Sequence, residues 1–232
     1  MRTIYLNCEN GVSGDMVLNA LIDLCERPDA VRSELHRISH AIEERGGHEH
    51  HHGHDQAHTH DHFHRSYQEV KEIIDSVPVG NEVKVIAQQI YAVIAKAESA
   101  VHGDPLDDLH FHEVGRDQAI ANVLGTAVCI DSLQADSIIV SEICDGHGTV
   151  KCAHGILSVP VPAVKAMLDE CTLVYRQTEQ EGEMVTPSGL AMVIGSGAVT
   201  GSRPDGEPVC SAEAFGGRRF GHHGLIAELY IA

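Results

Sequence analysis

The sequence predicts an α/β fold: a single domain over residues 1–232, with a mixed or mainly parallel sheet flanked by helices. Short β-rich apolar runs alternate along the chain with stretches whose apolar residues recur at helical spacing. Glycine and proline residues mark the boundaries between these segments. A histidine-rich, low-complexity stretch at residues 46–64 has no apolar periodicity, and it predicts a flexible loop that interrupts the domain.

The chain opens with a strand, a glycine loop and a helix. Thr3–Cys8 is apolar and predicts a short buried strand, and Gly11–Asp15 follows as the loop. Apolar residues then recur at helical spacing over Met16–Leu24, with Ser13 as a suitable N-cap. A second helix is expected from Ala30 to about Glu44.

Helices and strands continue to alternate beyond the histidine-rich stretch. Ser66 and Glu69 form a capping-box pattern that opens a short helix toward Ile74. The further expected elements are a helix over Val83–Val101, a strand-like alternation over Leu109–Val114, a helix over Ile120–Ile130, a β-rich segment at Ser137–Ile143, a short β stretch among Gly146, Gly148 and Gly155, a helix entered at Pro160 and Pro162, a strand at Leu173–Tyr175, a helix beginning at Thr186–Pro187 and a closing strand at Leu225–Ile231.

The charge of the chain restricts its partners. Sixteen basic and thirty-four acidic residues give a net charge of −18, so nucleic acid and anionic membranes are excluded as expected partners. The same charge attracts metal cations, although acidity that only keeps a protein in solution fits equally well. No apolar run is long enough to span a bilayer and no signal peptide opens the chain, so we expect a cytoplasmic protein.

The seven cysteines are widely scattered and contain no C-x-x-C pair. This pattern predicts reduced core residues rather than a disulfide framework. A thiolate ligand role for Cys8 or Cys152 is the alternative. The sequence leaves a homo-oligomer open.

The histidine-rich stretch is the strongest compositional signal. Neutral imidazole binds nickel, copper, zinc and cobalt, but such a stretch imposes no single geometry and does not select among these metals. It predicts recruitment or buffering of a metal, and the alternative is a solvated loop that binds metal incidentally. Its candidate metal ligands are His48, His50, His51, His52, His54, His58, His60, His62 and His64.

The glycine loop is a candidate anion site. Gly11 and Gly14 permit close backbone approach, and the amides around Ser13 and Asp15 lie at a helix N-terminus, which suits a phosphate or carboxylate. The loop matches neither established phosphate-binding glycine motif. Many strand-to-helix turns contain glycine and serine for structural reasons alone, so that reading stays open.

A third group is His110-Phe111-His112-Glu113. On a strand His110 and His112 share one face while Glu113 points the other way, and on a loop all three converge. Two histidines beside a carboxylate suggest a metal site as readily as a structural pair. A more diffuse group contains possible anion ligands or proton-transfer residues at His147, Lys151, His154, Thr186 and Ser188.

Several segments together resemble the family that inserts nickel into pyridinium-3,5-bisthiocarboxylic acid mononucleotide during maturation of the lactate racemase cofactor. They occur in the family's order up to about residue 195, and this collinearity is more specific than any one motif. The matching segments are Tyr5–Cys8, Gly11–Met16, the histidine-rich stretch ending at His64–Tyr67, Val101–Gly103, His110–Gly115, Gly148–Gly155, Pro160–Ala163 and Glu183–Gly189.

The resemblance implies a lyase-class enzyme, a cyclometallase that forms nickel–sulfur and nickel–carbon bonds using CTP with Mn or Mg. In the family the nucleotide is handled by a C-terminal portion, which this chain is expected to need as a partner when it is separately encoded. The apoprotein of lactate racemase is a further candidate partner. The implied catalytic residues are Asp15, His112, Glu113, Lys151 and His154; the implied cofactor-binding residues are Gly11, Ser13, Gly14, Thr186 and Ser188; His110 and His112 join the histidine-rich stretch as metal ligands.

The chain departs from the family pattern at two places. Asn7 stands where the family usually has Asp, and Gln118–Asn122 replaces an Asp-Ser-Ile-x-Asp pattern. Losing those carboxylates weakens a hard-cation site or removes a general base. Binding of nickel and precursor is therefore the firmer expectation. The rival hypotheses are a non-catalytic nickel store or delivery protein and, on weak motifs alone, a phosphate-ester hydrolase.

Overall fold

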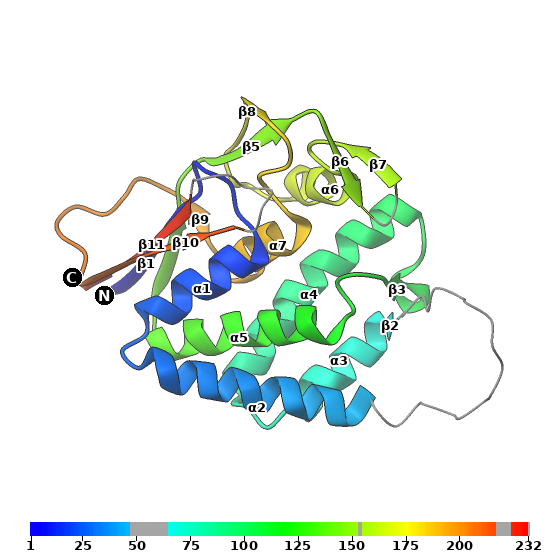
Figure 1. Cartoon of the computed structure of the whole chain (residues 1–232), viewed down its shortest axis with the longest axis horizontal. Helices are drawn as coiled ribbons and strands as arrows, with labels where there is room; N and C mark the ends of the chain where they lie inside the picture. The colour runs from blue at the N-terminus through cyan, green and yellow to red at the C-terminus, as the bar shows by residue number, and fades with distance from the viewer. Residues whose placement is uncertain (47–64, 153–154, 217–223, 232) are drawn as a thin grey trace.

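A five-stranded sheet in the order β10-β11-β1-β4-β9 forms one side of the molecule (Figure 1). The computed structural model describes residues 1–46, 65–152, 155–216 and 224–231. β1 and β4 pair in parallel, as do β4 and β9, while β11 is antiparallel to both β1 and β10. The predicted α/β fold is confirmed in its mixed form. The strands are β1 (Arg2–Asn7), β4 (Ser137–Val140), β9 (Val199–Thr200), β10 (Cys210–Phe215) and β11 (Gly224–Ile231).

The two faces of this sheet differ in chemistry. On β1, Ile4 and Leu6 point into the hydrophobic core, as the period-two alternation of a strand requires. The opposite face carries Glu228 and Tyr230, where the Arg203 Nε donates to the Glu228 carboxylate at 2.7 Å and lies 2.9 Å from the Tyr230 hydroxyl. The segment after β9 thus covers the face away from the core.

The helices pack on the core side of the sheet (Figure 1). α1 crosses β10 and β11 and also contacts α2, α5 and α7. The long α4 contacts α3, α5, α6 and α7 and so connects the two ends of the helical layer. The helices are α1 (Gly14–Leu24), α2 (Pro28–Gly46), α3 (Tyr67–Ser76), α4 (Asn81–His102), α5 (Asp117–Leu133), α6 (Pro162–Glu170) and α7 (Pro187–Gly195), with a short 3₁₀ helix η2 (Leu106–Asp108). In the described part of the chain, no helix is long and apolar enough to cross a membrane.

Helix starts follow the local signals in the sequence. Ser13 caps α1 by accepting from the Met16 amide at 3.3 Å. Both halves of the predicted capping box of α3 are present, because the Glu69 amide donates to Ser66 Oγ and the Ser66 amide donates to the Glu69 carboxylate. Thr186 caps α7 and Pro187 occupies its first turn. These residues satisfy amides that a helix start leaves without intrahelical partners.

Three pairs of short strands lie outside the main sheet. β2 (Arg65–Ser66) pairs with β3 (His110–Phe111), β5 (Ile143–His147) with β8 (Tyr175–Glu181), and β6 (Thr149–Cys152) with β7 (Gly155–Ser158).

The predicted strand over Leu109–Val114 is therefore only two residues long. The chain folds back at Gly115, where an added Cβ would lie 2.9 Å from that of Phe111, and this turn ends the pairing. Of the predicted loop at 46–64, Gly46 is the last residue of α2, and 47–64 lie outside the described residues.

The contact between α4 and α7 leads to a stability prediction. A Cβ on Gly195 would lie 2.5 Å from the Cα of the buried Ile90, so Gly195→Ala forces the two helices apart. We expect it to lower the free energy of unfolding by about 1–3 kcal/mol, as overpacking does. Chemical denaturation measures this difference. The control Gly80→Ala adds a Cβ that meets nothing within 4 Å, and an equal loss in both variants would contradict the packing argument.

Candidate functional site

The loop after β1 lies directly against the segment that leads into α7. Val12 and Val185 form a parallel bridge. The Val12 amide donates to the Met184 carbonyl at 2.9 Å, and the Thr186 amide donates to the Val12 carbonyl at 3.0 Å. The starts of α1 and α7 are thereby fixed side by side, although they are far apart in the sequence.

The glycines of this loop serve that close packing. Gly11 has a φ of +88°, and a Cβ there would lie 2.2 Å from the Met184 carbonyl oxygen. A Cβ on Gly14 would meet Ser188 Oγ at 3.0 Å, and one on Gly189 would meet the Ser13 Cα at 2.6 Å. Gly11, Ser13 and Gly14 are buried against the start of α7. Of the two alternatives left open by the sequence, a structural turn therefore accounts for these glycines, and anion binding by the loop stays a prediction.

Asp145 on β5 stabilises the same junction by accepting hydrogen bonds from the segment before α7. Its side chain is fully buried, and one carboxylate oxygen accepts from the amides of Gly146, Met184 and Val185 at 2.8, 2.8 and 3.0 Å. The other oxygen accepts from the Tyr175 hydroxyl at 3.2 Å. Burial raises the pKa of this carboxyl above its ordinary value, and the hydrogen bonds it accepts oppose that shift without cancelling it.

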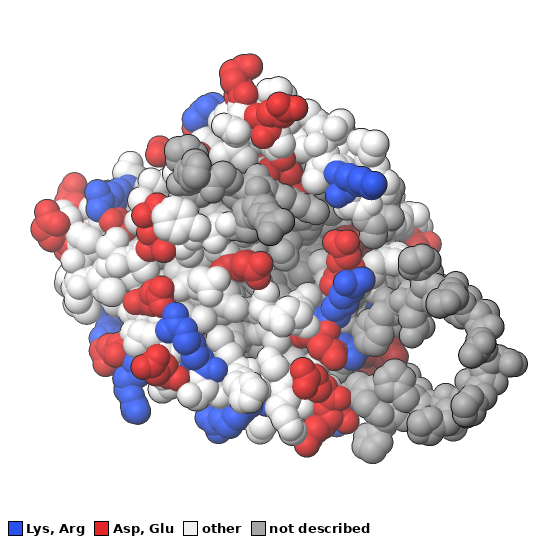
Figure 2. Space-filling view, viewed as in Figure 1, with Lys and Arg blue, Asp and Glu red and all other residues white. Residues whose placement is uncertain are grey.

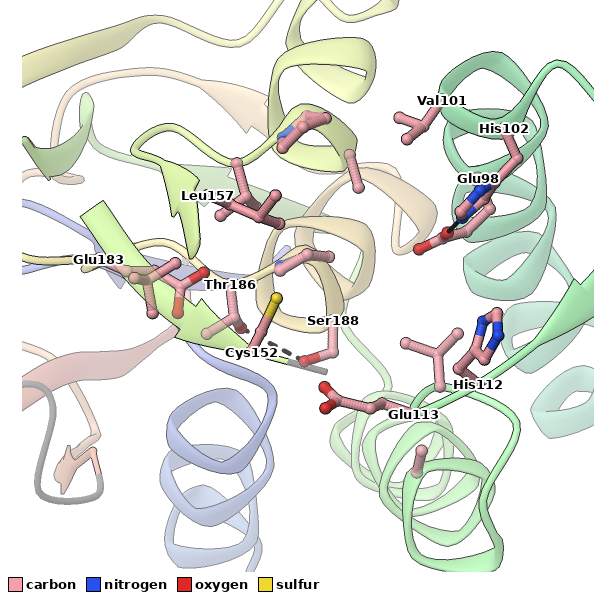
Figure 3. A pocket seen from close by; sticks show the side chains of 17 residues that line it. Glu98, Val101, His102, His112, Glu113, Cys152, Leu157, Glu183, Thr186 and Ser188 are labelled. Atoms are coloured by element: carbon pink, nitrogen blue, oxygen red, sulfur yellow. Dashed lines mark hydrogen bonds and ion pairs between the residues drawn. The ribbon is translucent and has the colours of Figure 1, made fainter. Parts of the chain in front are cut away.

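A cavity of about 470 Å³ opens beside the start of α7 (Figure 3). Its size falls in the range of small-molecule sites. It brings His112 and Glu113 together with Thr186 and Ser188, although the two pairs are far apart in the sequence. Apolar walls are supplied by Val101, Val114, Ala119, Val150, Leu157, Val161, Pro162, Ala163 and Pro187, and the remaining polar lining by Glu98, His102, Cys152 and Glu183.

The turn that carries His112 and Glu113 is held by residues behind the cavity. The Tyr91 hydroxyl donates to the Val114 carbonyl at 2.9 Å. The nearly buried Arg65 guanidinium donates to the Gly115 carbonyl at 3.2 Å and pairs with Asp117 at the start of α5. These contacts point Glu113 toward the α7 start (Figure 3).

The start of α7 contributes the hydroxyl residues Thr186 and Ser188 to the cavity lining. Thr186 Oγ1 accepts from the Gly189 amide at 3.2 Å and lies 3.3 Å from Ser188 Oγ. The N-terminus of α6 meets the same cavity at Pro162. Helix N-termini carry partial positive charge, so this wall favours an anionic group such as a phosphate. Cys152 from β6 lies across the cavity from α4 (Figure 3).

The opposite wall favours cations. Glu98 and His102 project from the end of α4, and the His102 Nε2 lies 3.2 Å from the Glu98 carboxylate. The neighbouring turn adds His112 and Glu113, so this side has two carboxylates and two imidazoles, whereas the buried Glu183 lies by Thr186 on the side of the α7 start (Figure 3). Acidic side chains are also spread over the face in Figure 2, where the described surface shows no extended patch of Lys and Arg.

The other predicted site residues lie elsewhere. Asp15 accepts from the Asn122 side chain at 2.9 Å in a separate hollow between α1, α2 and α5. Lys151 is exposed and does not line the cavity that its neighbours Val150 and Cys152 line, since strand neighbours face opposite sides. His110 is exposed on β3 and lines a second hollow, shared with His112. His154 and the nine histidines of the stretch lie outside the described residues.

The cysteines of the described structure are all free thiols, as predicted. Burial raises the pKa of Cys8, which keeps its thiol protonated and makes it a poor metal ligand. Cys152 is only partly buried and lines the cavity, so it is the better placed of the two cysteines singled out in the sequence.

Comparison with known proteins decides the family. The pattern of the nickel insertion protein family matches residues 4–229. The chain belongs to this family. It is 36% identical to the pyridinium-3,5-bisthiocarboxylic acid mononucleotide nickel insertion proteins of Alkaliphilus metalliredigens and Acetivibrio thermocellus, over 82% and 83% of this chain and 51% of each relative. The protein of the same name from Lactiplantibacillus plantarum is 33% identical over 83% of this chain and 52% of the relative.

The chain spans about half the length of the curated relatives it matches. No solved structure matches it.

Three polar residues of this nickel insertion family member's cavity were not singled out from the sequence as site residues. Glu98 and His102 are four residues apart on α4, so they share one helix face, but that spacing is common in exposed helices. His102 and Glu183 both lie in segments that resemble the family, Val101–Gly103 and Glu183–Gly189. The signal in the sequence that could have identified them is a charged or ionisable residue within or beside a segment that resembles the family.

Asp145 provides a stability prediction. Asp145→Ala leaves three amides, two of them buried, without their acceptor, and we expect it to lower the free energy of unfolding by about 2–5 kcal/mol. Asp145→Asn keeps an acceptor oxygen and should lose clearly less. Urea unfolding at pH 7 measures both losses, and equal losses would contradict a stabilising role for these hydrogen bonds.

The same residue gives a pH prediction. Because the pKa of Asp145 is raised in the folded protein, the folded state holds this proton more tightly than the unfolded chain. Its stabilising contribution is complete below the unfolded pKa of about 3.9 and is lost as pH rises through the higher folded pKa. As pH rises from acid toward neutral, the unfolding free energy of wild type should therefore fall relative to that of Asp145→Asn. A pH-independent difference would contradict the raised pKa.

Proposed function

We propose that this chain holds nickel and pyridinium-3,5-bisthiocarboxylic acid mononucleotide while nickel is inserted to form the nickel-pincer cofactor. The observation that carries the proposal is the cavity that joins His112 and Glu113 to the Thr186–Ser188 helix start. A phosphate suits the helix start, a ring suits the apolar walls, and a metal cation suits the histidine and carboxylate side.

The chemistry assigns different work to the two residues of the turn. His112 supplies an imidazole for the incoming nickel. Two thiocarboxylates at ring positions 3 and 5 place a metal next to the carbon between them, and a nickel–carbon bond there releases that carbon's proton. Glu113, which lines the cavity and points toward the α7 start, is the proposed acceptor of this proton. Asp15 and Lys151 lie outside the cavity and carry no step of this proposal.

In this proposal nickel insertion is a lyase-class step that uses CTP with Mn or Mg, and the nucleotide is handled by the portion of the family proteins that lies beyond the match with this chain. That portion is the proposed partner, and the apoprotein of lactate racemase is the proposed acceptor of the finished cofactor. The histidine-rich stretch supplies nickel in the cytoplasm. Its role rests on its composition alone.

Reconstitution tests the proposal. Full chain, C-terminal portion, nickel, precursor, CTP and Mg or Mn should yield a nickel-containing product, detected by mass spectrometry and by activation of apo lactate racemase. Glu113→Gln removes the proton acceptor and should lower the rate about 100-fold or more. Glu207→Gln, an exposed residue remote in sequence from the cavity-lining segments, is the matched control and should leave the rate unchanged.

Two outcomes would count against the proposal. Wild-type chain that gives no product under these conditions would overturn it. Deletion of residues 47–64 should spare activity when nickel is plentiful, and complete loss under those conditions would favour a nickel store instead.

A further inference from the structure

The cavity shares a wall with a second, outer hollow. His102 and His112 line both, and the outer hollow of about 420 Å³ adds Asp104, Asp108 and His110. The outer hollow is acidic and more open to solvent, whereas the inner cavity is largely apolar. The two histidines therefore line both the polar outer hollow and the proposed substrate cavity, and Figure 3 shows them on the cavity side.

The two rings are close enough to share one metal ion after a small adjustment. Their centres are 6.3 Å apart with a tilt of 42°. An imidazole nitrogen binds a first-row metal at about 2.1 Å, so two rings on one metal have centres on the order of 5–6 Å apart. In the described part of the chain, no three His, Cys, Asp or Glu side chains already converge as a metal site. The described residues thus offer two imidazole ligands, and water or substrate atoms can take further positions on the metal.

Glu98 orients one of these rings. Its carboxylate lies 3.2 Å from His102 Nε2 and is only 19% exposed, one helical turn before the histidine. A carboxylate at Nε2 favours the tautomer with the proton there, which leaves Nδ1 as the metal-binding nitrogen. Carboxylate partners of this kind orient metal-binding histidines in many proteins.

We propose that His102 and His112 together bind a nickel ion and pass it from the outer hollow to the sulfur atoms of the substrate, with Glu98 as the positioning residue for His102. The identity of the sulfur acceptor rests on the proposed function, whereas metal binding by the pair does not.

A two-histidine site suits transfer better than storage. A closed four-ligand site holds its metal, but a site with two protein ligands keeps positions open for incoming donors. Sulfur donors from the substrate complete the coordination and draw the metal inward. Asp104 and Asp108 at the entrance raise the local concentration of cations without joining the inner site.

Residue-resolved chemical footprinting tests metal binding in the full chain. Histidine modification by diethyl pyrocarbonate is followed at each position by peptide mass spectrometry, with and without Ni²⁺ in excess over the histidine-rich stretch. Nickel should slow modification of His102 and His112 together. His147, an exposed single histidine on β5, should be unaffected. His36 and His40, one turn apart on α2, provide a positive control for chelation by a histidine pair.

The variants separate pairwise binding from general exposure. His102→Ala should abolish nickel protection of His112, and His112→Ala should abolish that of His102. Glu98→Ala should raise the nickel concentration needed for protection about 10–100-fold, as loss of an orienting carboxylate does, while Glu98→Gln, which keeps an acceptor oxygen, should restore part of it. Glu44→Ala removes the corresponding partner of His40 and should leave His102 unchanged.

The outcomes distinguish this inference from the proposed function. The shared site would be overturned, even when product forms, by nickel protection of only one of the two histidines. Nickel protection of either histidine that persists after the other is replaced by alanine would overturn it as well. Joint protection in wild type together with failed product formation would support the metal site and overturn the proposed function. Circular dichroism of His102→Ala and the milder His102→Asn excludes unfolding as the cause of lost protection.

Discussion

The close approach of two backbone segments, the loop after β1 and the segment before α7, determines where everything else in the site can lie. Val12 and Val185 pair there, and the glycines at positions 11, 14 and 189 allow the two backbones to approach this closely. Asp145 satisfies two further amides of the same segment from below. α7 begins at this junction, and α4 packs against α7. The positions of the cavity walls therefore depend on a contact between two segments that are far apart in the sequence.

The charge arrangement of the cavity matches a ligand that is positive at one end and negative at the other. Carboxylates and imidazoles from α4 and the His112–Glu113 turn form one side, and the starts of α6 and α7 form the other. The proposed substrate joins a pyridinium ring, to which nickel is added, to a phosphate. A simple nickel store has no need for the apolar walls or for the helix starts, so the geometry favours insertion over storage.

Sequence patterns predicted what is local and missed what depends on tertiary contacts. The caps at Ser13, Ser66 and Thr186 were predictable because each acts within one helical turn. β10 was not, since its apolar alternation is short and it is fixed mainly by pairing with β11. From the sequence, the glycine loop fitted an anion site and a structural turn equally, because glycine indicates a close approach without showing what approaches. His112, Glu113, Thr186 and Ser188 were each singled out, but only the fold brings them together.

The departures from the family pattern are accommodated by hydrogen bonds within this chain. Gln118 donates to Asn122 at 2.8 Å and Asn122 donates to Asp15 at 2.9 Å, so a neutral amide faces the Asp15 carboxylate. An aspartate at 122 would set two carboxylates against each other and require a proton or a cation between them. The carboxylate of Asp117, the residue before this segment, pairs with Arg65 and not with the groups around Asp15. The hollow at Asp15 therefore has no electrostatic need for a metal, and the groups suited to nickel chemistry in the described structure are those around His102, His112 and Glu113.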